Sequence, residues 1–142
     1  DKGRLQIDFS KFQELQYLSI DWFNKFPDLS KNTYLDHLVI WKMKPKSKSF
    51  EELHLPNNLK ILHITEANIK SLEGLKLKNL LHFEAHYCSS LESLQGLSNF
   101  GKNLNVIILD YCKKLVDYSE IENCQELEKI ILGDCGNLPT IK

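Results

Sequence analysis

Side chains that could bind a metal ion or exchange a proton recur through the middle of the sequence. They are His63, Glu84, His86 and Asp110, spaced roughly one repeat or two residues apart. Imidazole and carboxylate groups are common ligands of divalent transition metals. Because these residues are far apart in the sequence, they can form one site only if the fold places them side by side. The secondary structure that contains them must therefore be considered first.

Three of the four cysteines also recur at a regular interval. Cys88, Cys112 and Cys135 are 24 and 23 residues apart, and Cys124 falls outside this series. A metal or redox cluster is one interpretation, but the chain has no Cys-x-x-Cys pair of the kind that zinc sites use. We expect three small thiols that stack in a buried column without disulfides. Free buried thiols favour a reducing compartment, which predicts a cytoplasmic protein.

These residues belong to a repeat that is found six times. Each unit reads Leu, two variable residues, an apolar residue, one variable, an apolar residue, two variable, and then a small or apolar residue. The units start at Leu15, Leu35, Leu59, Leu80, Leu104 and Leu127, which are 20, 24, 21, 24 and 23 residues apart. A period of 20–50 residues is the signature of a solenoid or another repeat architecture.

The centre of each unit alternates between apolar and variable residues, which predicts a short strand. The strands should lie near residues 18, 38, 62, 83, 107 and 130. The rest of each unit carries apolar residues three apart, such as Ile69, Leu72 and Leu75, which suits a 3₁₀ turn. Gly74 and Gly96 occupy equivalent places and should permit a positive φ in a turn. Because a unit this short cannot bury its own apolar side, the units must stack into a parallel sheet.

This pattern resembles the leucine-rich repeat family. The Cys-x-x-Leu after each of the last three units resembles its cysteine-bearing variant, and Leu55-Pro56-Asn57-Asn58-Leu59 resembles the entry of bacterial repeats. The resemblance implies an α/β leucine-rich repeat solenoid with about 6–7 short parallel strands and an irregular or 3₁₀ convex side. Residues 1–142 would form one domain, with an irregular strand or cap over 1–14 and six repeats over 15–142. We expect a C-terminal cap to be missing.

One side of the predicted sheet, which we call the open face, carries an unusual set of side chains. It comprises the third, fifth and seventh places of each unit, with the eighth at the strand's end, and would be concave in a curved solenoid. It holds four of the five His, both Trp and three of the five Tyr. Trp and Tyr are enriched in protein interfaces, whereas idle surface is rich in Lys and Glu. The expected partner-binding residues are Trp22, Trp41, His63, Glu84, His86, Tyr87, Asp110 and Tyr111.

An open sheet offers no pocket that excludes water, and the chain lacks Ser-His-Asp, phosphate-loop and dinucleotide signatures. We therefore predict no enzyme, no cofactor and no metal. The formal charge is −1, and the open face carries five acidic residues against two lysines, so nucleic acid is not an expected ligand. The longest apolar run is four residues, Val106 to Leu109, and predicts no membrane span.

The leading hypothesis is a non-enzymatic module that binds a protein with its open face. The resemblance extends to immunity proteins of toxin–antitoxin pairs, and an acidic face would suit a basic, nuclease-like toxin. Two alternatives remain open. The chain could be the recognition segment of a larger effector, ligase or immune-sensor protein, or a secreted leucine-rich repeat adhesin.

Overall fold

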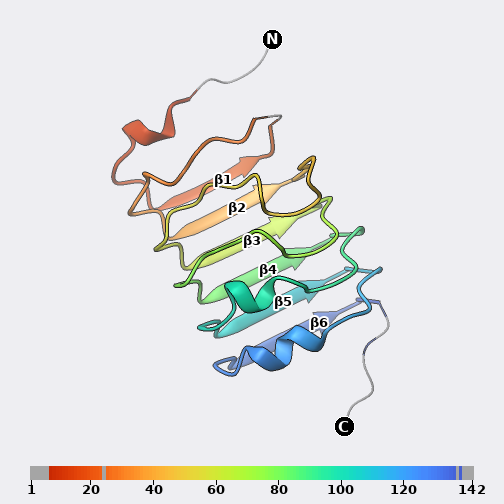
Figure 1. Ribbon diagram of the computed structural model, residues 1–142. Helices are drawn as coiled ribbons and strands as arrows, with labels where there is room; N and C mark the ends of the chain where they lie inside the picture. Colours follow the sequence, from red (N-terminus) through yellow and green to blue (C-terminus); the bar gives the residue numbers. More distant parts are fainter. Residues whose placement is uncertain (1–6, 24, 137, 139–142) are drawn as a thin grey trace.

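Six parallel strands form one sheet in which spatial order follows chain order (Figure 1). The structure, a computed structural model, describes residues 7–23, 25–136 and 138. The strands are β1 (Tyr17–Asp21), β2 (His37–Trp41), β3 (Ile61–Thr65), β4 (His82–His86), β5 (Val106–Asp110) and β6 (Lys129–Gly133). The segments that connect them lie on one side of the sheet, so the chain winds as a solenoid with one strand per turn. The predicted solenoid and all six predicted strands are confirmed.

The strands pair without any shift between equivalent positions of the repeat. Leu18 pairs with Leu38, which pairs with Leu62, and the series continues through Phe83 and Ile107 to Ile130. In β2 to β5 the residues of this row are fully buried. The residues two positions later in each strand, which are Ile40, Ile64, Ala85 and Leu109, are fully buried as well. Ile130 in β6 is half exposed. The core is therefore a stack of equivalent apolar rows between the sheet and the connecting segments.

The α/β label is not confirmed, because the described residues contain no α-helix. Their helical elements are three short 3₁₀ helices, η1 (Phe9–Lys11), η2 (Leu97–Asn99) and η3 (Ser119–Asn123). The apolar residues three apart in the connecting segments are buried, as a 3₁₀-like path requires.

Polar side chains and glycines tie neighbouring turns together. The amides of Asn79 and Asn103, each just before the first Leu of its repeat, donate to the carbonyls of Asn57 and Lys78 one turn earlier, at 3.1 and 2.9 Å. Gly74 and Gly96 have φ of +95° and +100°, which confirms the predicted positive dihedral. A Cβ at Gly96 would also lie 2.5 Å from the carbonyl oxygen of Leu72.

The residue after each of β2 to β5 leaves the strand in the left-handed region, although none is glycine. Lys42, Glu66, Tyr87 and Tyr111 have φ between +54° and +56°. Each donates its backbone N–H to the last residue of the next strand, at 2.8–2.9 Å. This turn ends the strand and points two tyrosines along its carboxyl edge.

The predicted ends of the domain are only partly described. Residues 1–6 of the expected N-terminal strand or cap lie outside the described residues, as does nearly all of the chain after Gly136. The expected N-terminal cap includes η1, and the Asn32 amide binds the carbonyls of Phe9 and Phe12 at 2.8 and 3.2 Å. None of the helices in the described chain has the length and apolar character that crossing a membrane requires.

Candidate functional site

The open face is built from the first, third and fifth residue of each strand, which align across the sheet in three rows. The middle row passes from Val39 through His63 and Glu84 to Ile108. The row at the carboxyl end passes from Trp41 through Thr65 and His86 to Asp110. The repeat thus brings the central predicted site residues onto three neighbouring strands, β3, β4 and β5.

Glu84 is the centre of a compact cluster of imidazoles. Its Oε1 lies 2.7 Å from Nε2 of His82, and its Oε2 lies 3.0 Å from Nε2 of His86 and 3.5 Å from Nδ1 of His63. The rings of His63 and His86 are 4.8 Å apart. On its other side, Nδ1 of His86 lies 3.5 Å from Oδ2 of Asp110. Three histidines therefore surround the Glu84 carboxylate, and the Asp110 carboxylate lies on the far side of the His86 ring.

The electrostatics of the cluster keep Glu84 ionised. Burial raises its pKa, but hydrogen bonds from His86 and His82 outweigh burial, and the net pKa lies below the usual value. Because an ionised carboxylate only accepts, the two Nε2 atoms donate. Burial lowers the pKa of His63, although Glu84 opposes the shift. At neutral pH the cluster therefore holds a negative carboxylate and a neutral His63.

Two tyrosines form a stacked pair beside this cluster. Tyr87 and Tyr111 follow β4 and β5, and their rings are 4.7 Å apart and within 8° of parallel. Lys113 Nζ lies 5.3 Å from the Tyr111 ring centre, within reach of a cation–π contact. The negative charge of Asp134 raises the pKa of Tyr111. Tyr87 is 54% exposed and Tyr111 is 37% exposed, so the pair presents a flat aromatic surface to solvent.

The two predicted tryptophans lie in different surroundings. Trp41, 41% exposed, donates its indole N–H to Ser19 Oγ at 2.9 Å and has its ring 6.5 Å from that of His63. Trp22 stacks on Phe26 at 5.0 Å and packs against the core cluster. The two residues lie side by side at the carboxyl ends of β1 and β2, where the Trp22 backbone N–H donates to the Trp41 carbonyl at 2.8 Å, but their rings have different partners. The surface around Glu84 therefore has Trp41 on one side and the tyrosine pair on the other.

Two residues assigned to the open face are in fact covered there. Val39 in the middle row is 4% exposed, and Thr65 in the row at the carboxyl end is 5% exposed. The open face is therefore not uniformly exposed, because neighbouring side chains shield these two residues from solvent.

Sequence reasoning placed His82, His37 and Tyr17 on the open face but gave them no function. His82 makes the shortest contact to Glu84, and Tyr17 packs edge-on against His37 at 4.7 Å. The signal for His82 was available, since residues two apart on a strand share a face and His82-x-Glu84-x-His86 is therefore one row of contacts.

The cysteine column is present and unbridged. All four cysteines are free, and Cys88 and Cys112 are fully buried, whereas Cys135 is half-buried. The contact between the first two thiols separates their pKa values. A hydrogen bond from Cys112 lowers the pKa of Cys88, while the same contact and then burial raise that of Cys112. The column lies on the core side of the sheet, away from the histidines.

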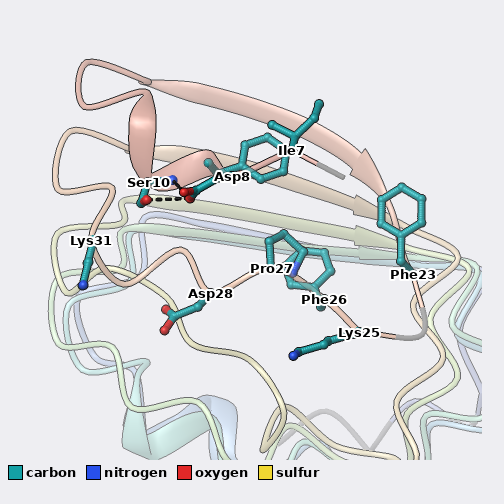
Figure 2. Close-up of a pocket in the computed structure, with 10 residues that line it drawn as sticks. Ile7, Asp8, Ser10, Phe23, Lys25, Phe26, Pro27, Asp28 and Lys31 are labelled. Carbon is teal, nitrogen blue, oxygen red and sulfur yellow. Dashed lines mark hydrogen bonds between the residues drawn. The ribbon is translucent and has the colours of Figure 1, made fainter. Parts of the chain in front are cut away.

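A cavity of about 700 Å³ lies at the N-terminal end of the solenoid, where Ile7, Phe23 and Phe26 give it an apolar lining (Figure 2). Its carboxylates are already occupied, since Asp8 accepts from the Ser10 hydroxyl and amide, and Asp28 accepts from the Ser30 amide. The cluster on β3 to β5 is the better candidate site.

No family model, curated protein or solved structure matches this chain. The class defined by the fold is a parallel β-solenoid, and function must be argued from the side chains of its open face.

Proposed function

We propose that this protein is a non-enzymatic binding module of the leucine-rich repeat type, and that it recognises a protein partner with its open face. The observation that carries the proposal is one surface in which exposed Trp41, Tyr87 and Tyr111 flank the Glu84 cluster. Rigid aromatic side chains around a polar centre are typical of the residues that dominate binding energy.

The aromatic side chains are already ordered without a partner. Trp41 is held by Ser19, and the two tyrosines hold one another by stacking on left-handed backbone positions. Ordering a flexible side chain at an interface costs about 0.5–1.5 kcal/mol. A surface that is fixed in advance avoids most of this loss, which supports a role in recognition.

The charge of the face favours a basic partner. Five acidic residues (Asp21, Glu66, Glu84, Asp110, Asp134) stand against Lys42 and Lys129. We propose a cationic protein surface as the ligand, and not nucleic acid or a lipid membrane, whose negative charges these carboxylates would repel. An immunity protein that neutralises a basic, nuclease-like toxin fits this chemistry, and the free thiols favour a cytoplasmic site of action.

The test compares variants of one surface against one partner. The partner is sought first as the product of the neighbouring gene and otherwise by affinity purification from the source cells. Calorimetry with a chelator present then measures its affinity for the wild type, Trp41→Ala and Tyr87→Ala. Each substitution should weaken binding at least about tenfold, because truncating a central aromatic residue loses about 2 kcal/mol or more.

The control is Lys102→Ala, an exposed residue in the turn before β5. It should leave affinity unchanged, and all three variants should melt within a few degrees of the wild type. Equal affinity of the wild type and both aromatic variants would show that the open face is not the binding surface. A partner with no excess of basic residues would contradict only the proposal that the protein neutralises a basic toxin.

A further inference from the structure

We propose that His63, Glu84 and His86 form a binding site for a divalent transition metal ion, of which Zn²⁺ is the best match. This inference stands apart from the proposed protein-binding function, although both concern the open face. It departs from the sequence-based expectation of no metal, which rested on the lack of a pocket that excludes water.

The distances among the three ligands suit a tetrahedral ion. One ligand atom from each residue lies within 4.8 Å of the other two. Glu84 Oε2 is 3.0 Å from His86 Nε2 and 3.5 Å from His63 Nδ1. Zn²⁺ bonds to nitrogen and oxygen at about 2.0–2.2 Å, which places neighbouring ligands of a tetrahedron about 3.3 Å apart. Two of the three edges are close to this value, and the third, between the two imidazoles, is at most 4.8 Å.

The backbone fixes these ligands on rigid elements. His63 is paired with Glu84 across β3 and β4, and His86 lies two residues further along β4 on the same face. The three side chains are one-fifth to one-quarter exposed, so their metal-facing atoms remain reachable from solvent. Three protein ligands then leave a fourth position for water or for a group on a partner.

Groups behind the ligands orient them in the manner usual for metal sites. In the metal-free protein Nε2 of His86 donates to Glu84. A metal ion would displace this proton, and Asp110 Oδ2, 3.5 Å from Nδ1 of His86, would then favour the tautomer that carries its proton on Nδ1. His82 holds the other oxygen of Glu84 at 2.7 Å, which leaves Oε2 to face His63 and His86. Two of the three ligands therefore have their own supporting contact.

The ligand chemistry selects the class of ion. Two imidazoles and one carboxylate suit Zn²⁺ and its first-row neighbours, whereas Ca²⁺ and Mg²⁺ require mostly oxygen ligands. The three-residue set contains no thiolate, and the cysteines lie in the core. The site should thus bind Co²⁺ as a coloured substitute for Zn²⁺ without any bond to sulfur.

The experiment titrates the intact protein with Zn²⁺ by calorimetry and with Co²⁺ by absorption spectroscopy, in a buffer that does not bind metals. One equivalent of each should bind, and Co²⁺ should give visible bands without a sulfur-to-metal charge-transfer band. His63→Ala, His86→Ala and Glu84→Gln should each weaken Zn²⁺ binding more than tenfold, with circular dichroism unchanged. Asp110→Asn should weaken it about 10–100-fold, as expected for a residue that orients a ligand.

The matched control is His54→Ala, an exposed histidine outside the strands. It should bind Zn²⁺ as the wild type does. Failure to bind one equivalent, unchanged affinity in the three ligand variants, or a sulfur-to-cobalt band would each overturn the proposal. Any of these results would leave the protein-binding test unaffected, since that test is performed with a chelator present.

Discussion

Replacing Gly96 with alanine should strongly destabilise the solenoid, for two reasons that add. The backbone at Gly96 has φ +100° and ψ −16°, a left-handed conformation that costs an L-residue about 1–2 kcal/mol. The new Cβ would also lie 2.5 Å from the carbonyl oxygen of Leu72 and 2.6 Å from the backbone of Glu73. These are atoms of the neighbouring turn, so relieving the overlap must move one turn against another, at about 1–3 kcal/mol.

Alanine also lowers the conformational entropy of the unfolded chain, which offsets about 0.4–1 kcal/mol of the destabilisation. The expected net loss is therefore about 1–5 kcal/mol in the free energy of unfolding. For a chain of 142 residues, about 3 °C in melting temperature corresponds to each kcal/mol, so the transition should fall by about 3–15 °C. Circular dichroism during thermal and urea unfolding measures both quantities, and the urea m-value should not change.

Gly133→Ala is the matched control. Its nearest foreign atom is the flexible carboxylate of Asp110 at 2.9 Å, and Gly133 is not among the residues with positive φ. Alanine in a strand is favoured over glycine by about 0.5–1 kcal/mol, so this variant should be neutral or slightly more stable. A loss below about 1 kcal/mol for Gly96→Ala, or similar losses for both variants, would refute the argument from close packing between turns.

Two further predictions concern buried groups. Burial raises the pKa of Tyr118 to about 12, so the stability due to its neutral form should be complete below the unfolded value near 10 and decline as the pH rises from 10 to 12. Tyrosinate absorbance should show one group that titrates last, and Tyr118→Phe should abolish it. Thiol labelling of the native protein should modify at most Cys135 rapidly, because Cys88, Cys112 and Cys124 are buried, and all four should react after denaturation without reductant. Fewer than four thiols would mean that a disulfide exists.

The strands could be predicted because two periods agree in the sequence. Alternation within a unit places Leu62 and Ile64 inward, and the repeat of the unit places Phe83 and Ala85 beside them. Together these periods set both the face and the register. The connecting segments were less predictable, because apolar residues three apart indicate burial but do not determine the backbone path. The α/β expectation came from the family resemblance and not from these residues.

The site was predictable as a surface but not as a set of contacts. Shared repeat positions placed His63, Glu84 and Asp110 on one face, yet the rotation of each side chain decides which groups meet. His63 therefore contacts His86 diagonally across the strands, and Trp22 turns away to stack on Phe26. The supporting roles of His82 and Asp110 follow from distances of 2.7 and 3.5 Å that no spacing in the sequence determines.

The two proposals for the open face are linked through charge. Without a metal, the carboxyl groups of Glu84 and Asp110 lie between Trp41 and the tyrosine pair, and a cationic group of a partner could pair with them. A bound divalent cation would neutralise this centre and offer its fourth coordination position instead. The preferred partner group would then change from a cation to a metal ligand such as a carboxylate or an imidazole. The same three side chains can therefore support recognition of two chemically opposite groups, and the metal content of the protein would decide which one binds.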